Sequence, residues 1–168
     1  HLRKPSLAVS LALALAPFPA SAAPDPALEP LAFLAGHCWI GTMPGTADTD
    51  EHCFAWMYDG RYLRDRHVVR RGEKAVYEGE TTYYWNSVAK QVEYFYVTAA
   101  GGHAQGTMVA AGDALEFPAA VMISGGKSFG FRGRWKRVGD EAYEVLREYE
   151  TDKGWMPVKV PMKKVARK

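Results

Sequence analysis

Turn-forming residues interrupt the chain at a steady interval, and the segments between them favour β-strands. The first turn lies at Pro44-Gly45 and the last at Lys153-Gly154, with 11–15 residues from one turn to the next. The intervening segments are rich in Tyr, Trp, Phe, Val and Thr, which fit a pleated, half-buried surface. The nine turns therefore predict ten strands joined as consecutive hairpins.

Apolar and polar residues alternate within several segments, and this alternation identifies the inward side of each strand. In 75–85 the odd positions carry Tyr and Trp, whereas the even positions include two glutamates. In 91–98 the even positions are the more aromatic, and in 129–137 the odd positions are. The inward aromatic residues predicted in this way are Tyr83, Trp85, Tyr94, Tyr96, Phe131 and Trp135.

Consecutive hairpins with one apolar face favour an all-β fold, an up-and-down antiparallel β-barrel of about 8–10 strands. Closing the sheet removes the exposed edges that an open meander of this length would carry. Residues 29–36 predict a short helical turn before the first strand, ended by Gly36. We expect one barrel domain over 31–168, because no repeat or linker interrupts it.

The first residues have the three-part pattern of a secretory signal. A basic start precedes the uncharged run 7–16, prolines end that run, and small residues at 20–22 suit cleavage. The apolar run is about half the length that a membrane span needs. We expect a signal peptide at 1–22, an extended leader at 23–30, and export to the bacterial periplasm or secretion. No transmembrane segment is expected in the mature chain.

Composition and charge narrow the possible partners. The chain has 168 residues, of which 48% are hydrophobic and 24% charged, which is typical of a globular domain. The formal net charge of +2 is too small to indicate nucleic-acid binding, and Arg3 and Lys4 of the signal-like segment account for it. We therefore expect no nucleic-acid partner.

The two cysteines, Cys38 and Cys53, flank the turn-forming run 44–48. If 38–42 and 50–57 form a hairpin, the cysteines lie opposite each other, where their Cβ atoms are close enough to bridge. Export also favours a disulfide, because thiols outside the cytosol are not kept reduced. We predict a Cys38–Cys53 disulfide, with two free buried thiols as the alternative.

Each cysteine follows a histidine, and the pairs His37-Cys38 and His52-Cys53 together contain a tetrahedral zinc ligand set. Adjacent strand residues point to opposite faces, so each histidine would face away from its cysteine. A two-histidine site on the other face is the remaining option, but structural zinc needs four convergent ligands. The sequence therefore predicts no metal and no cofactor.

Three charged or titratable residues fall on inward faces. Arg147 lies between two inward apolar or aromatic positions, and Asp65 and His67 share the better core face of 61–71. A buried charge must be paired or used, since its desolvation costs several kcal/mol. Two interpretations stay open: a structural Asp65–Arg147 or Asp65–His67 network, or a polar floor that orients a ligand in an aromatic cavity.

The stretch 31–41, Leu-Ala-Phe-Leu-Ala-Gly-His-Cys-Trp-Ile-Gly, resembles the opening of calycin-type barrels, where a helical turn precedes Gly-x-Trp on the first strand. It is most similar to nitrobindin-like and other small bacterial barrel families that begin Phe-Leu-x-Gly-x-Trp-x-Gly. Residues 58–63 and 77–79 resemble the same families. This chain has one residue more between Gly36 and Trp39 than that pattern.

The resemblance implies a barrel with a ligand cavity, in which Trp39 packs at the closed end against an Arg or Lys from a late strand. Arg147 or Lys163 matches that cation, which favours a structural role for Arg147. Nitrobindin-like barrels hold haem through a histidine near the C-terminus. This chain has no histidine after His103, so that haem ligand does not carry over.

These observations predict an exported lipocalin-like protein that binds a small hydrophobic or amphipathic molecule. One alternative is an isomerase, lyase or hydrolase with an Asp65–His67 acid–base pair, although no nucleophile is visibly placed beside it. Another is a structural or interaction domain whose barrel is filled by side chains. The residues expected to contact a ligand are Trp39, Asp65, His67, Tyr83, Trp85, Tyr94, Tyr96, Phe131, Trp135 and Arg147.

Overall fold

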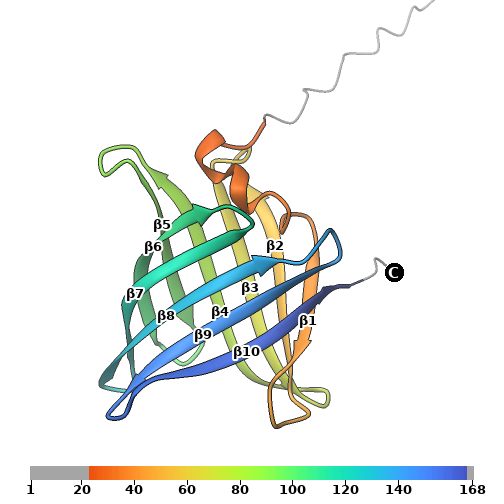
Figure 1. Cartoon of the computed structure of the whole chain (residues 1–168), viewed down its shortest axis with the longest axis vertical. Coiled ribbons are helices and arrows are strands. Elements are labelled where there is room, and N and C mark those ends of the chain that lie inside the picture. The colour runs from red at the N-terminus through yellow and green to blue at the C-terminus, as the bar shows by residue number, and fades with distance from the viewer. Residues whose placement is uncertain (1–22, 166–168) are drawn as a thin grey trace, which may run out of the picture.

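The computed structural model describes residues 23–165, which form a closed barrel of ten antiparallel strands (Figure 1). This confirms the predicted all-β up-and-down barrel; the predicted signal peptide, 1–22, lies outside the described residues. The strands are β1 (Cys38–Thr42), β2 (Thr49–Met57), β3 (Tyr62–Arg71), β4 (Lys74–Asn86), β5 (Gln91–Thr98), β6 (His103–Ala111), β7 (Ala114–Ser124), β8 (Lys127–Arg137), β9 (Ala142–Thr151) and β10 (Gly154–Lys164).

The barrel closes through a short seam between its first and last strands. β1 pairs with β10 only through Trp39–Lys164 and Ile40–Lys163, whereas it pairs with β2 along its whole length. Every other strand pairs with its two neighbours in the chain. The seam satisfies the backbone groups that two sheet edges would otherwise expose.

Side chains inside the barrel follow the predicted alternation. Thr81 and Tyr83 of β4 and Val92 and Tyr94 of β5 are buried, and the residues between them are more exposed. All ten strands contribute to a single core cluster. In β7 the alternation is broken, because the pairing with β8 shifts register between Phe117 and Ala120, where Pro118 lacks an N–H to donate.

A short 3-10 turn, η1 (Pro26–Leu31), covers one end of the barrel (Figure 1). Asp25 caps it by accepting a hydrogen bond of 2.9 Å from the Ala27 N–H. Leu28, Leu31 and the following Leu34 are fully buried in the core cluster, so the turn works as an apolar plug. The Trp39 indole N–H donates to the Leu34 carbonyl at 3.2 Å, which ties the plug to β1.

The helical turn begins earlier than expected. It starts at Pro26 rather than at 29, so most of the stretch expected to be extended, 23–30, is helical. Asp25-Pro26 supplies a capping side chain and a first residue that needs no N–H, which together start a helix. Within the described part of the chain, no helix has the length and apolar character needed to cross a membrane.

The predicted disulfide is confirmed. Cys38 and Cys53 lie directly opposite each other in the β1–β2 pairing, with Cα atoms 4.0 Å apart and sulfurs bonded. Their neighbours Trp39 and Phe54 are buried inside, so the disulfide lies on the outer face. It links the strand that carries the seam to the rest of the sheet.

Breaking the disulfide should weaken the fold measurably. The bond closes a loop with a sequence separation of 15, for which chain entropy predicts a contribution of about 3 kcal/mol. We expect Cys38→Ser/Cys53→Ser to lower the free energy of unfolding by about that amount, measured by urea denaturation. An unchanged denaturation midpoint in the double variant would contradict this role.

The plug should contribute to the stability of the fold as buried core residues do. Leu31→Ala leaves a cavity at a fully buried position, so we expect it to lower the free energy of unfolding by about 2–5 kcal/mol. Val109→Ala, on a residue of β6 that is 54% exposed, is the matched control and should change it little. Equal losses in the two variants, measured by thermal and urea unfolding, would show that η1 is not part of the core.

Candidate functional site

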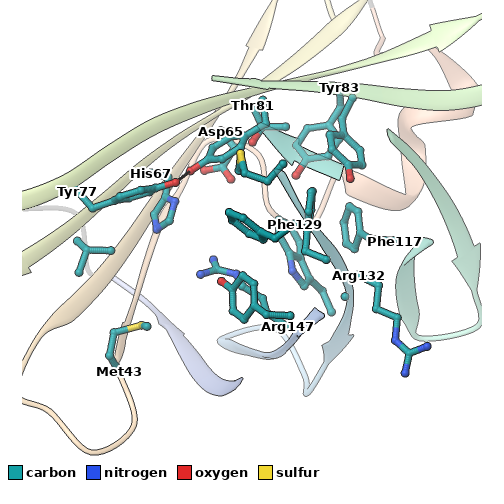
Figure 2. A pocket seen from close by; sticks show the side chains of 18 residues that line it. Met43, Asp65, His67, Tyr77, Thr81, Tyr83, Phe117, Phe129, Arg132 and Arg147 are labelled. Carbon is teal, nitrogen blue, oxygen red and sulfur yellow. Dashed lines mark hydrogen bonds between the residues drawn. The ribbon is translucent and has the colours of Figure 1, made fainter. Parts of the chain in front are cut away.

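The barrel holds a cavity of about 360 Å³ in the half away from η1 (Figure 2). Several lining residues lie near the hairpin turns at that end: Met43 follows β1, Tyr77 lies near the start of β4, and Tyr149 lies near the end of β9. The interior is therefore not completely filled by side chains. The full lining is Met43, Asp65, His67, Val69, Tyr77, Thr81, Tyr83, Tyr94, Tyr96, Phe117, Met122, Phe129, Phe131, Arg132, Gly133, Trp135, Arg147 and Tyr149.

Most residues expected to contact a ligand line this cavity. The exceptions are Trp39 and Trp85, which belong to the core near the plugged end. Trp39 packs edge-on against Tyr143, with ring centroids 5.1 Å apart, and Trp85 lies close to the end of β4. The residues that do line it are Asp65, His67, Tyr83, Tyr94, Tyr96, Phe131, Trp135 and Arg147.

One wall of the cavity is aromatic. Phe117 and Trp135 are in close contact, with ring centroids 4.7 Å apart, and Tyr83 and Tyr94 approach Phe117 at 6.3 and 6.0 Å. Such tilted and edge-on pairs stabilise one another beyond the area they bury. Phe117 was not predicted, because the bulge after it in β7 removes the alternation that would have identified its face.

Small residues make room for two of these rings. A Cβ atom on Gly79 would lie 2.5 Å from the Tyr96 hydroxyl oxygen, and one on Gly106 would also collide with Tyr94. Gly106 of β6 pairs directly with Tyr94, and Gly79 of β4 lies two residues from Thr81, the partner of Tyr96. The tyrosine rings therefore lie against backbone, which fixes their hydroxyls at the cavity surface.

A polar cluster from β2 and β3 borders the cavity, which Asp65 and His67 line, whereas Asp50 and His52 lie outside the lining. We call this side the polar wall. His52 and His67 face each other across these strands and stack, with ring centroids 4.2 Å apart at 16°. His52 Nδ1 lies 2.7 Å from Asp65 Oδ2, in a buried hydrogen bond. Asp50, fully buried, lies with Oδ1 2.5 Å from His67 Nε2, but the angles of that contact are not those of a hydrogen bond.

Arg147 reaches this cluster from β9. Its Nη1 donates to Asp50 Oδ2 at 3.3 Å, and its Nη2 lies 2.9 Å from His52 Nε2. The guanidinium can only donate, so the second contact is a hydrogen bond when Nε2 carries no proton. Protonated, the same nitrogen would instead face Asp50 Oδ1, 3.3 Å away.

The predicted pairs within this cluster were wrong in detail. Asp65 pairs with neither His67 nor Arg147; it pairs with His52, while His67 and Arg147 meet Asp50. Asp50 was not predicted, and His52 was considered only together with His37, because the inner face of β2 mixes acidic, basic and aromatic residues and shows no apolar alternation. The register that places His52 opposite His67 is a property of two strands together.

The charges of the cluster oppose one another. Burial raises the pKa of Asp50, but Arg147 and the two histidines outweigh it and hold that pKa well below its usual range. Burial lowers the pKa of His52, yet Asp65 and Asp50 outweigh it and raise the pKa to about 9. Burial lowers the pKa of His67 to about 4, and the charge of His52 acts in the same direction. His67 is therefore neutral at ordinary pH.

Several buried polar atoms at this site have no hydrogen-bond partner among the described residues: Asp50 Oδ1, Asp65 Oδ1, His67 Nε2 and the Tyr94 hydroxyl. Tyr77 and Tyr96 satisfy each other through their hydroxyls. An unpaired buried polar group costs about 1–3 kcal/mol, so folds seldom keep one without a use. The unpaired atoms mark where a polar group could bind.

Comparison of the chain with models of protein families and with curated proteins finds no match. The closed antiparallel barrel is compatible with a calycin-like fold. The resemblance implies that a cation from a late strand packs on Trp39. In this barrel that cation is Lys164 rather than Arg147 or Lys163, with its Nζ 5.3 Å from the ring centroid. Lys164 is the residue that pairs with Trp39 across the seam.

Removing the Arg147 side chain should lower the free energy of unfolding, because the buried Asp50 carboxylate then lacks its cation. Arg147→Met leaves Asp50 without its cation, and breaking a buried pair costs about 3–5 kcal/mol of stability. Arg134→Met, which breaks an exposed 3.1 Å pair with Glu116, is the control and should change stability little. Chemical denaturation compares the two, and a small loss for both would mean that Arg147 is not needed to hold Asp50.

Proposed function

We propose that this protein is an exported, single-domain, lipocalin-like barrel that binds a small amphipathic molecule in its cavity. The observation that carries the proposal is that the cavity has an apolar, aromatic side and a polar side. Aromatic rings line one side of it, and Asp65, His67 and Arg147, which bring charge and unpaired polar atoms, line another. Small-molecule sites typically combine an apolar lining with a few polar groups that fix orientation.

The aromatic wall would supply most of the binding free energy. Phe117, Phe131 and Trp135 present ring surface to the cavity, and removing apolar surface from water contributes about 25 cal/mol per Å². The volume of about 360 Å³ is at the low end of ligand pockets, which run from about 300 to 1,000 Å³. The ligand is therefore a compact molecule rather than a long chain.

The polar wall would orient the ligand. The Arg147 side chain is 19% exposed and borders the cavity, so its guanidinium can donate to an acceptor on the ligand. The Tyr94 hydroxyl, which lacks a partner, adds a second hydrogen-bonding group at the cavity surface. A molecule with one apolar face and an acceptor-bearing edge fits this pair of walls.

Ligand binding is better supported than acid–base catalysis by the predicted pair. That alternative needed Asp65 to orient His67, and Asp65 is hydrogen-bonded to His52 instead. Export is supported by the Cys38–Cys53 disulfide and by the signal-like pattern of 1–22. The nitrobindin-like opening motif supports a place for the chain among calycin-type barrels.

Blocking the cavity should abolish binding. We expect anilinonaphthalene sulfonate, an aromatic anion, to bind the protein with enhanced fluorescence and to quench its tryptophan emission, since Trp135 lines the cavity. Val69→Trp fills space beside the polar wall and should weaken binding at least about tenfold, the equivalent of losing about 1.4 kcal/mol. Val109→Trp, on the 54% exposed outer position, is the matched control.

Equal affinity in the two variants would mean that the probe binds the outer surface, and the proposal would fail. Native mass spectrometry of the protein purified from its producing cells gives a second readout. A retained small molecule that is lost in Val69→Trp would support the cavity as its site.

A further inference from the structure

We infer that Asp50, His52 and His67 form a binding site for a divalent transition-metal ion in the polar cluster beside the cavity. Each offers one ligand atom, and these atoms all lie within 4.8 Å of one another. The three side chains are buried, at 0%, 3% and 6% exposure. The inference concerns the cluster alone and does not depend on the proposed binding of an organic molecule.

The β2–β3 pairing brings the ligand atoms together. His52 lies directly opposite His67, and Asp50 precedes His52 by two residues on the same inward face of β2. The distances are 2.5 Å from Asp50 Oδ1 to His67 Nε2 and 3.3 Å from Asp50 Oδ1 to His52 Nε2. Two rigid strands therefore hold all three ligands, which keeps the cost of ordering them low.

Asp65 holds His52 in the orientation that a metal ligand needs. Its Oδ2 accepts from His52 Nδ1 at 2.7 Å, so Nε2 is the nitrogen left facing the cluster. Metal-binding histidines almost always give their second ring N–H to a carboxylate, a carbonyl or water in this way. Asp65 is thus a positioning residue with a role separate from the three ligands.

Two of the proposed ligand atoms are buried without a hydrogen bond, which also favours a bound cation. Asp50 Oδ1 and His67 Nε2 are buried and form no hydrogen bond, although they lie side by side. One cation could take up the lone pairs of both atoms once they move apart to about 3 Å, because zinc ligands each lie about 2.0–2.2 Å from the ion.

The Arg147 guanidinium competes with a metal ion for the side chains of Asp50 and His52. Its guanidinium donates to Asp50 Oδ2, which leaves Oδ1 free, but its Nη2 also lies 2.9 Å from His52 Nε2. A metal ion on Nε2 requires the guanidinium to leave that nitrogen, and the adjoining cavity gives it room to do so. The positive charge of Arg147 would therefore weaken metal binding without preventing it.

The ligand set indicates the class of ion. Two imidazoles and one carboxylate suit Zn²⁺, Ni²⁺, Cu²⁺ or Fe²⁺, whereas Mg²⁺ and Ca²⁺ prefer oxygen ligands throughout. Three protein ligands leave a coordination position open, as catalytic zinc sites do and structural ones do not. The sequence predicted no metal because His37-Cys38 and His52-Cys53 could not converge as four ligands. The combination of His52 with His67, which the fold pairs, was not considered.

The first test uses the unmodified protein. After chelator treatment and buffer exchange, we expect isothermal titration with ZnCl₂ to give one site per chain, and CoCl₂ to give visible d–d absorption typical of a site with four or five ligands. No heat and no absorption band would overturn the inference. MgCl₂ is the negative control and should give no binding at the same concentrations.

Variants locate the ion. We expect His52→Gln and His67→Gln to weaken Zn²⁺ binding strongly and Asp65→Asn to weaken it by about 10- to 100-fold, the usual effect of losing an orienting partner. His103→Gln, on an exposed histidine of β6, is the matched control and should bind as the unmodified protein does. Near-UV circular dichroism verifies that each variant is folded. Unchanged binding in folded His67→Gln, or loss only in His103→Gln, would assign the ion to the surface and overturn the site.

Arg147→Met gives the result that a purely structural ion network would not produce. Removal of the competing cation should tighten Zn²⁺ binding about tenfold or more, because the ion then meets Asp50 without a neighbouring positive charge. Weaker binding in this folded variant would overturn the assigned geometry. ZnCl₂ and the organic probe are titrated separately into the unmodified protein, so failure of the metal inference and failure of the proposed function can be told apart.

Discussion

The barrel depends on a seam of two residue pairs between β1 and β10. This is the shortest pairing in the sheet, and the features around it compensate for its length. The disulfide fixes β1 to β2 on the outside, Trp39 is buried on the inside beneath Lys164, and the plug hydrogen-bonds back to the indole. Opening the seam would expose two sheet edges and uncover the core at the same time, so closure and core packing are one cooperative event.

Inside that closed sheet, the polar cluster is permitted because its charges balance locally. Asp50 has no access to water and contacts Arg147 and both histidines, which together offset the cost of its burial. These contacts join β2, β3 and β9, so the cluster also braces opposite sides of the barrel. A ligand or ion that displaces one of these side chains must replace its charge or its hydrogen bonds. The cluster therefore favours ligands that carry a matching charge or matching polar groups.

The strands, their faces and the disulfide could be predicted because each rests on local rules: turn chemistry, period-two alternation and the geometry of one hairpin. The aromatic wall followed largely from the same alternation, except for Phe117, where the bulge at Pro118 interrupts it. The polar cluster could be predicted only in part. Asp65, His67 and Arg147 stood out as charges on apolar faces, whereas Asp50 and His52 lie on a strand with no such contrast. Their pairing depends on the register between β2 and β3, which no single strand encodes.

The plug lies at the end of the barrel where the described chain enters and leaves. Asp25 N–H donates to the Gly60 carbonyl, and Val165 N–H donates to the Cys38 carbonyl, so the described chain enters and leaves the barrel on the η1 side (Figure 1). The cavity lies toward the other end. Both ends of the described chain therefore lie on the plugged side of the barrel, and the cavity lies away from them.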